Sequence, residues 1–395
     1  MTKKSDAPAI RFKGFSDAWE QRKFGEITSK YEDPVPTPHD GYYRLGIRSH
    51  AKGTFHSYVA KGQELETAQM HRVAAGNFIV NITFGWEHAV AITDKNDAGK
   101  LVSHRFPQFS FAEGMVPEFF RYVIVDEKFR HHLWLASPGG AGRNRVLKLD
   151  EMLNYLMRFP SRDEQIKIAE FFRHLDNLIT LHQRKFEKLT NVKKSMLEKM
   201  FPQNGSSYPE IRFKGFTDPW EQRKFEEIAV RSSVICSDDT LPRVEYEDIV
   251  SGTGRLNKDI YAKQSSKSGI AFHQGDVLYG KLRPYLQNWL LPTFDGLAVG
   301  DFWVLQPQNA DSSFLYRLIQ SRQFDEVANQ STGTKMPRAD WKLVSKTVFS
   351  IPSNISEQAA IGTYFTALDS LITLHQRELE KLQNIKKSML EKMFV

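Results

Sequence analysis

Two glycine-rich loops carry the residues whose types and spacing most suggest chemistry. They read SPGGAGRNR and NQSTGTKMPR, and each holds the frame G-x-x-x-x-R, as Gly140 with Arg145 and as Gly333 with Arg338. A glycine lets the backbone approach a phosphate closely, and an arginine can donate two parallel hydrogen bonds to a phosphate or to a guanine edge. We therefore expect both loops to contact DNA. A surface turn with a salt-bridged arginine is the alternative interpretation.

The match between the loops rests on counting residues back from a shared Glu-Gln pair at Glu164 and Glu357. On that count Arg145 corresponds to Arg338, whereas Pro160 and Pro352 fall one residue out of step. The frame is also short enough to arise by chance. The loop residues that we expect to bind DNA are Arg143, Asn144, Arg145, Lys335 and Arg338.

A second set of candidate DNA contacts lies outside these loops. Basic and aromatic side chains of this kind bind phosphates or base edges. The set comprises Arg44, Arg48 and His50 in YYRLGIRSH, and Lys281, Arg283 and Tyr285 in YGKLRPY. The first half of the chain has no basic pair after its own β-rich run Phe78–Ile82, where it reads GNFIVNITFGW. If both halves bind DNA, we expect them to read different sequences.

The overall charge is compatible with a polyanionic partner. The chain of 395 residues has a formal net charge of +7 and a pI near 9.2. Lysine and arginine gain affinity for nucleic acid by releasing the counterions condensed on its phosphates. Many basic proteins bind no nucleic acid, so charge alone does not decide the matter.

Motifs for catalysis are absent from the sequence. There is no GxxxxGK[ST] phosphate loop, no HExxH, no CxxC and no [DN]PP[FYW] of the kind that positions a base amino group for methyl transfer. Glu118 with Asp126–Lys128 resembles a nuclease carboxylate cluster, but a solvated helix face explains this spacing more simply. We expect the chain itself to catalyse nothing.

The cysteine count and the apolar pattern bear on the compartment. Cys236 is the single cysteine, which excludes an internal disulfide and is compatible with a reducing compartment. The first residues, MTKKSDAPAI, hold no apolar run of signal-peptide length, and no apolar run of membrane-span length occurs. We expect a cytoplasmic protein without a membrane partner.

The elements that must position these residues are written twice in the chain. Ile10–Ile27 reads IRFKGFSDAWEQRKFGEI and Ile211–Ile228 reads IRFKGFTDPWEQRKFEEI. Asp163–Phe201 and Ser356–Phe394 share LITLHQR and KKSMLEKMF without a change. The stretches between these shared segments barely resemble each other. A repeated scaffold that carries two different inserts suits a protein that presents two unlike recognition surfaces.

The second shared segment predicts a long helix with a coiled-coil seam. Its apolar residues alternate in steps of four and three, broken only at Lys193 and Lys386. Residues 164–200 would form a rod of about 55 Å. His182 and His375 occupy equivalent seam positions, either as polar residues that fix the register or as a pH or metal site. The seam residues that we select are Phe172, Leu175, Ile179, His182, Leu189, Phe365, Leu368, Ile372, His375 and Leu382.

Two such seams in one chain most simply pack against each other. Parallel packing would require long crossovers, so we expect an antiparallel pair and an approximate internal dyad. The inserts have short β-rich runs and helical patterns near Pro117–Phe129 and Ser312–Val327. The expected fold class is α+β, with two mixed α/β globules separated by long helices that form an antiparallel coiled coil.

The whole plan resembles the specificity subunit of type I restriction–modification enzymes. Phrases typical of that family are DxxWEQRKF before each insert, EQxxI and LITLHQR at the helices, and GDVLYGKLRPY in the second insert. The first insert departs from the last phrase, which leaves its contacts with DNA less defined. The resemblance covers essentially the whole chain.

The resemblance implies a division of labour among several subunits. Each insert would be a target recognition domain that reads one half of a bipartite, asymmetric site in double-stranded DNA, and the helices would set the spacer between the halves. The helices would also dock two methyltransferase subunits, which carry S-adenosylmethionine, and the complex would recruit restriction subunits that use ATP and Mg. This chain would bind none of these cofactors. The expected segments are 1–158 and 210–352 for the recognition domains, with 159–209 for the central helix and linker and 353–395 for the C-terminal helix.

Two other functions remain open at the level of sequence. A freestanding DNA-binding regulator would need no enzyme partner, but unlike inserts argue against the palindromic site that such proteins usually bind. A coiled-coil scaffold for protein partners would make no phosphate contacts, and its retention on DNA would therefore fail at low salt. The half-site sequences, the spacer length and the methylated adenine depend on side-chain positions that the sequence does not give.

Overall fold

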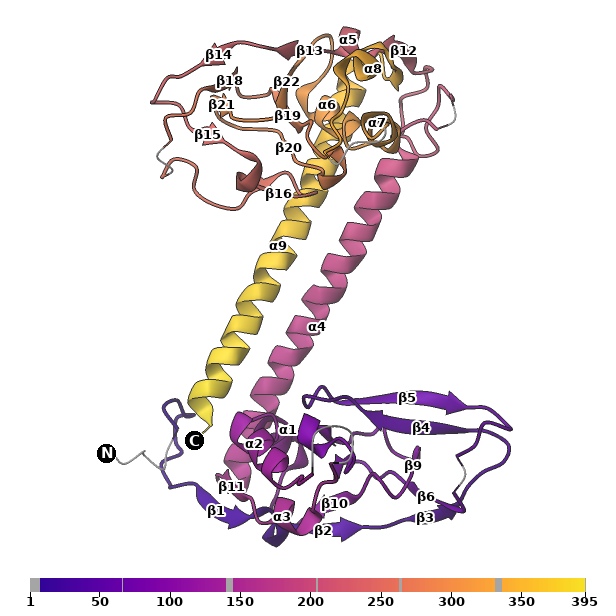
Figure 1. The fold of residues 1–395 in the computed structure, drawn as a ribbon, viewed down its shortest axis with the longest axis vertical. Coiled ribbons are helices and arrows are strands. Elements are labelled where there is room, and N and C mark those ends of the chain that lie inside the picture. Colours follow the sequence, from indigo (N-terminus) through magenta and orange to yellow (C-terminus); the bar gives the residue numbers. More distant parts are fainter. Residues whose placement is uncertain are drawn as a thin grey trace. The chain divides into compact units, whose positions relative to one another are not determined.

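Small β-sheets and two long helices make up the fold in the computed structural model. The structure describes residues 8–65, 67–139, 145–203, 205–262, 265–330 and 336–394. The chain divides into two compact units, each built from separate parts of the sequence. The first unit holds the residues up to Leu181 together with those from Leu379 onward, and the second holds His182–Glu378. Each long helix therefore contributes one part to each unit (Figure 1). The four sequence segments proposed above remain a prediction.

The first unit contains three sheets and three short α-helices in its described residues. The sheets have the strand orders β1-β11, β2-β10-β7-β8 and β3-β6-β9-β4-β5. The elements are β1 (Glu20–Lys23), η1 (Phe24–Glu26), β2 (Thr28–Tyr31), β3 (Pro34–Pro36), β4 (Tyr42–Ile47), β5 (Thr54–Val59), β6 (Gln69–Arg72), β7 (Phe78–Val80), η2 (Gly85–Glu87), β8 (Val90–Ile92), β9 (Leu101–Val102), β10 (Gln108–Phe111), α1 (Pro117–Val123), α2 (Glu127–Leu135), α3 (Leu149–Leu153), β11 (Leu156–Phe159) and the start of α4 (Arg162–Lys199).

The second unit repeats part of this plan. Its sheets have the orders β12-β23, β13-β22-β19-β20, β14-β18-β21-β15 and β16-β17. The elements are β12 (Glu221–Lys224), α5 (Phe225–Ile228), β13 (Ala229–Ser232), β14 (Ile235–Cys236), β15 (Arg243–Val244), η3 (Tyr246–Asp248), β16 (Ile249–Val250), β17 (Arg255–Leu256), β18 (Gly269–Phe272), β19 (Val277–Gly280), η4 (Pro284–Leu286), β20 (Trp289–Leu290), β21 (Gly296–Ala298), β22 (Phe302–Pro307), α6 (Ser312–Leu318), α7 (Arg322–Ala328), α8 (Trp341–Lys346), β23 (Val348–Ile351) and the start of α9 (Ile355–Met393). The mixed strand and helix content confirms the α+β class.

The four-stranded sheets of the two units have matching strand orders and registers. Thr28 faces Phe111 across β2 and β10, and Ala229 faces Pro307 across β13 and β22. One strand further, β7 pairs with β10 and β19 pairs with β22, both in antiparallel fashion. Since side chains alternate between the two faces of a strand, this register makes Phe78 and Val277 equivalent positions. The match provides a frame in which the two inserts can be compared residue by residue.

The shared segments before the inserts supply core residues and the first strand. Trp19 and Phe24 are buried in the core of the first unit, as Trp220 and Phe225 are in the second. The charged EQRK between them forms β1 or β12, which pairs with the strand just before the long helix. The segments therefore lead into the globules as predicted, and their apolar residues stabilise the domain by burial.

A buried ion pair explains the shared glutamate at the start of each long helix. Arg11 donates from Nε and Nη2 to Glu164 at 2.7 and 2.8 Å, and Arg212 does the same to Glu357 at 2.7 and 2.8 Å. The Glu164 side chain is 0% exposed. Such a bidentate pair offsets the desolvation of the carboxylate, which lies in the first helical turn where a negative charge is favoured.

The glutamine that follows each glutamate bonds to two backbone groups. In the first unit, Gln165 accepts from Val116 N at 2.9 Å and donates to the carbonyl of Pro160 at 2.9 Å. In the second unit, Gln358 accepts from Asp311 N at 2.8 Å and donates to the carbonyl of Pro352 at 2.7 Å. The Glu-Gln pair therefore joins each long helix to its own globule.

The two lysines that interrupt the apolar repeat form ion pairs between α4 and α9. In the first unit, Lys386 Nζ lies 2.6 Å from Asp176 Oδ1, and in the second unit Lys193 Nζ lies 2.6 Å from Asp369 Oδ1. Burial lowers the pKa of Lys193, and the Asp369 carboxylate opposes this change. The lysines are therefore part of the contact between the helices rather than defects in it.

Burial of the selected seam residues falls toward the middle of each helix. Phe172, Leu175, Phe365 and Leu368 are buried in the cores of the units. His182 and His375 lie side by side with their Nδ1 atoms 3.2 Å apart. The remaining members are half-buried, namely Ile179, Leu189, Ile372 and Leu382.

Candidate nucleic-acid interface

The basic residues of the second unit lie where three backbone segments meet at the end of β19. Asp301 is the residue before β22, and its carbonyl accepts a hydrogen bond of 2.9 Å from the N–H of Lys281. On the other side, Ala339 N donates to the carbonyl of Lys281 at 2.8 Å, and a backbone bridge joins Leu282 to Arg338. The fold thus brings Lys281 and Arg338 together, although they are distant in sequence.

The Asp301 carboxylate is the centre of this cluster. Its Oδ1 lies 3.5 Å from Lys281 Nζ, and its Oδ2 lies 3.0 Å from Arg338 Nη2. The side chain of Asp301 is 29% exposed and that of Arg338 is 57% exposed. Ion pairs this exposed contribute about 0–1 kcal/mol, so a phosphate or base edge can compete for both cations. The cluster is therefore available for binding.

The backbone under Asp301 is held by a tyrosine. The Tyr246 hydroxyl donates to the carbonyl of Asp301 at 2.6 Å and accepts from Leu282 N at 2.9 Å. Burial raises the pKa of Tyr246 well above its ordinary value. The hydroxyl therefore stays protonated across the physiological pH range and keeps donating.

Arg283 and Tyr285 lie beside this cluster in the turn after β19. Arg283 has φ +50° and precedes the short helix η4. Its Nε is buried and has no hydrogen-bond partner in the described part of the chain. The Tyr285 side chain is 57% exposed, so it is free to stack on a base or sugar.

The same backbone arrangement occurs in the first unit with different side chains. Ile82 N donates to the carbonyl of Arg105 at 3.0 Å, and Leu147 N donates to the carbonyl of Ile82 at 2.9 Å. These bonds match those of Lys281 with Asp301 and Ala339. Ile82 thus occupies the position of Lys281, and Arg105 occupies the position of Asp301.

The predicted equivalence of Arg145 and Arg338 is wrong by one residue. Because Leu147 corresponds to Ala339, the residue that corresponds to Arg338 is Val146. The count failed because the turn before α9 has one residue more than the turn before α4, between the matched prolines and the shared glutamates. The prolines that seemed out of step were in the correct register.

Arg145 nevertheless lies near the turn that corresponds to YGKLRPY. Its guanidinium carbon lies 5.0 Å from the ring centroid of Trp134 and 5.9 Å from that of Trp86. In the matched frame Trp86 occupies the position of Tyr285. The other loop candidates, Gly140, Arg143, Asn144, Gly333 and Lys335, lie outside the described residues.

Arg44, Arg48 and His50 lie on the hairpin of β4 and β5. Arg44 is half-buried in β4, whereas Arg48 and His50 are exposed at the turn. The guanidinium carbon of Arg48 lies 5.3 Å from the ring centroid of Phe55, and its Nη1 donates to the carbonyl of Thr54. The hairpin thus presents two basic side chains and an exposed aromatic ring together.

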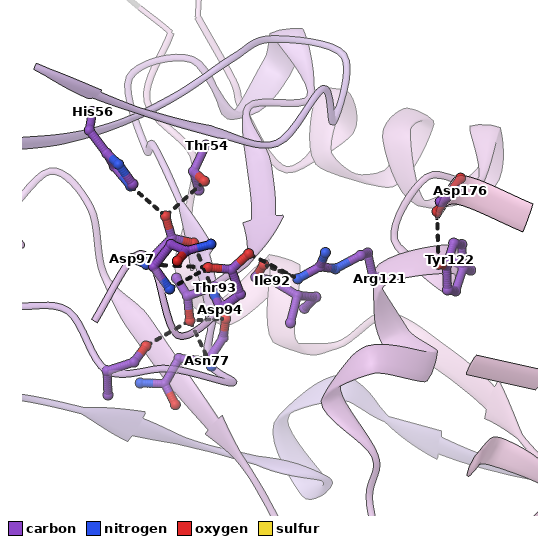
Figure 2. Close-up of polar contacts among 12 residues, drawn as sticks. Thr54, His56, Asn77, Ile92, Thr93, Asp94, Asp97, Arg121, Tyr122 and Asp176 are labelled. Carbon is purple, nitrogen blue, oxygen red and sulfur yellow. Dashed lines mark hydrogen bonds and ion pairs between the residues drawn. The ribbon is translucent and has the colours of Figure 1, made fainter. Parts of the chain in front are cut away.

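A polar network around Asp97 fixes this hairpin to the rest of the first unit (Figure 2). Asp97 Oδ1 accepts from Thr54 Oγ1 at 2.9 Å and lies 2.8 Å from His56 Nε2, and its Oδ2 accepts from Asp94 N at 2.9 Å. The Asp97 side chain is 3% exposed. A buried carboxylate bonded in this way resists displacement, so the hairpin has a defined position for binding.

A hollow separates the hairpin from the turn after β7. The volume of the hollow is 620 Å³, and Arg44, Phe55, Phe84, His104 and Arg105 are among the residues that line it. His104 and Arg105 are exposed, and the sequence reasoning missed both of them. The usable signal was a basic pair shortly before the β-rich run Gln108–Phe111; the second unit has Asp301 at the position of Arg105.

The described residues give little support for a metal site, a nuclease site or a membrane span. Within the described ranges, no three His, Cys, Asp or Glu side chains gather where they could hold a metal ion. The carboxylates that resembled a nuclease cluster lie on α1 and α2, where Glu127 is 76% exposed and pairs with Arg130. In the part of the chain that the structure covers, no helix has the length and apolarity of a membrane span.

Comparisons with known proteins point to one family. Residues 220–384 match the family model described as the type I restriction modification DNA specificity domain. The chain is 23% identical over 294 residues to the type I restriction enzyme MjaVIII specificity subunit of Methanocaldococcus jannaschii, covering 68% of each chain. It is 25% identical over 263 residues to the EcoDI specificity subunit of Escherichia coli, covering 62% of this chain and 58% of that one.

A solved structure shares the fold. The type I restriction–modification system S subunit from M. genitalium superimposes with a TM-score of 0.61 at 12% sequence identity. The match covers 98% of this chain and 99% of that chain. At this identity the likeness concerns the fold alone.

Proposed function

Because the chain belongs to the family of type I restriction–modification specificity subunits, we propose that it gives such a complex its DNA sequence specificity through two unlike recognition surfaces. The observation that carries this proposal is the matched backbone frame at the ends of β7 and β19. The same hydrogen bonds hold Ile82 and Arg105 in one unit and Lys281 and Asp301 in the other. A constant frame with different polar groups suits modular reading of two different half-sites.

Each recognition surface combines cations with exposed aromatic rings. In the second unit these are Lys281, Arg338 and Tyr285, and in the first they are Arg48 and Arg145 with their aromatic neighbours. Cations held near the surface bind phosphates and fix the orientation of the duplex, whereas groups that reach a base edge read its sequence. The target is a bipartite, asymmetric site, with one half-site for each recognition domain.

The long helices set the distance between the half-sites as an antiparallel coiled coil. Two observations support this arrangement. In each unit the later part of one helix pairs with the earlier part of the other, through Lys386 with Asp176 and through Lys193 with Asp369. Residue numbers that rise along one helix while they fall along the other support antiparallel packing and, with it, an approximate internal dyad.

The chain is non-catalytic and works with partner subunits. Two methyltransferase subunits dock on the repeated helix surfaces and supply S-adenosylmethionine, and restriction subunits supply ATP hydrolysis and cleavage in the presence of Mg. A methyltransferase must take its adenine out of the stack, so the specificity subunit must hold the duplex while the partner takes the base. The complex acts in the cytoplasm.

Methylation mapping of the assembled complex tests this function. The chain is expressed with the methyltransferase subunits of a type I system, and adenine methylation is read across a plasmid library. We expect one motif with two different halves separated by an unspecified spacer. A complex that methylates no defined motif, or an isolated chain that binds a palindrome tightly without partners, would contradict the proposal.

A further inference from the structure

One position that the shared backbone frame defines differs sharply between the units. In the first unit this residue is Arg105, shortly before β10, and in the second it is Asp301, directly before β22. Both are placed by the same backbone bond, from Ile82 N and from Lys281 N respectively. One structural position therefore holds a cationic donor in one unit and an anionic acceptor in the other.

Arg105 has the position and the exposure that a contact with a bound ligand requires. It lines the 620 Å³ hollow together with Arg44 and Phe84. Among the described residues its guanidinium has no hydrogen bond or ion pair, because the positions that hold Lys281 and Arg338 in the second unit hold the apolar Ile82 and Val146 here. An exposed arginine without an internal partner keeps all five of its donors for a ligand.

Asp301 is a less obvious contact, because a carboxylate repels phosphates. Its own partners are Lys281 and Arg338, which screen that repulsion and leave acceptor capacity on each oxygen. The buried Tyr246 hydroxyl fixes its backbone. A carboxylate flanked by two cations on a DNA-binding surface is suited to accept from an amino group in the major groove while the cations bind the adjacent backbone.

We infer that this position determines one base in each half-site, with Arg105 donating to a guanine in the first and Asp301 accepting from a cytosine amino group in the second. The inference rests on the proposed function and adds the base-reading residues to it. Arginine fits the O6 and N7 acceptors of guanine, and a carboxylate fits the N4 donor of cytosine. The two units thus read opposite hydrogen-bonding patterns at one structural position.

The test exchanges each side chain for one with a different base preference. Arg105→Gln and Asp301→Asn are each assembled with the methyltransferase subunits, and methylated motifs are mapped. Because glutamine and asparagine pair with adenine, each variant should change one position of one half-site, from guanine to adenine or from cytosine to adenine. Discrimination for the original base should fall about 5- to 150-fold, which corresponds to one lost base contact.

Two control variants make the same change in charge at exposed sites away from the position of Arg105 and Asp301. Arg130→Gln alters an exposed arginine on α2 that pairs with Glu127, and Asp259→Asn alters an exposed aspartate that bonds to the Tyr261 backbone. Both controls should keep the wild-type motif.

The possible outcomes separate the inference from the proposed function. If the wild-type complex has a bipartite motif and both variants keep it, the inference is overturned and the proposed function stands. A uniform loss of affinity with an unchanged motif also overturns the inference, because it indicates a phosphate contact. If the wild-type complex has no bipartite motif, the proposed function fails first. If Asp301→Asn only released Lys281 and Arg338 onto phosphates, binding to every sequence would strengthen while the motif stayed unchanged, which would also overturn the inference.

Discussion

Removal of the arginine from the buried ion pair at the start of α9 should loosen the second unit locally. Glu357 is 2% exposed in its side chain and accepts two bonds from Arg212, at 2.7 and 2.8 Å, and one from Trp220 Nε1 at 3.2 Å. Arg212→Met leaves a buried carboxylate with one weak donor. Breaking a buried pair in this way costs about 3–5 kcal/mol. The double variant Arg212→Met with Glu357→Met should cost far less, because no charge stays buried.

Hydrogen exchange measured by mass spectrometry is a suitable assay, since the chain has two units and need not unfold in one step. For amides in the first turns of α9, a loss of 3–5 kcal/mol lowers protection by about two to three and a half orders of magnitude at about 1.4 kcal/mol per tenfold. The matched pair of Arg11 and Glu164 in the first unit provides an internal control. The amides in the first turns of α4, next to this pair, should keep their protection in the Arg212→Met variant.

Two results would refute this reasoning. A fall in protection below tenfold in Arg212→Met would mean that water reaches Glu357 and that the pair is not buried in solution. A double variant as unprotected as the single variant would mean that the arginine acts through packing rather than through charge.

Four further predictions concern recognition, spacing and pH. Arg338→Ala and Lys281→Ala should each weaken DNA binding by the assembled complex by about 1–3 kcal/mol if they contact base edges, or lower the salt slope by about one unit if they contact phosphates. Exchange of Lys30–Pro138 for the matching segment of a related chain should change one half-site only, as methylation mapping would record. Insertion of four residues after Thr190 should lengthen the helix by about 6 Å, close to two base pairs, and alter the preferred spacer. Burial, and then the nearby His182, lower the pKa of His375, so acidification through its ordinary pKa of 6.5 should destabilise the helix pair in urea titrations.

Each of these predictions has a contradicting outcome. Unchanged affinity and salt slope in both alanine variants would make Arg338 and Lys281 ordinary surface charges. A simultaneous change of both half-sites would exclude independent recognition domains. Altered half-sites with an unaltered spacer would show that the helix does not set the distance. For the histidine, the folded state disfavours the proton, so stability should be highest above the ordinary pKa; equal acid sensitivity in His375→Gln would assign the effect to other groups.

Features that depend on periodicity and repetition were predictable from the sequence. The steps of four and three predicted helices at α4 and α9, and the structure has them as Arg162–Lys199 and Ile355–Met393. The helical patterns near Pro117 and Ser312 are also confirmed, although each is broken into two short helices. Periodicity reports which face of an element is buried, and this is a local property of the chain.

Which residues share a surface depends on how distant segments pack together. Lys281, Asp301 and Arg338 are far apart in sequence, and the backbone bonds at the end of β19 bring them together. The sequence likewise presented Lys193 as a defect in the seam, since its partner Asp369 lies on another helix. The misplaced match of Arg145 has the same origin, because a count along the chain cannot detect one extra residue in a turn, whereas pairing between strands fixes the register. Contacts between distant segments depend on how sheets pair and pack, and this information is absent from any single stretch of sequence.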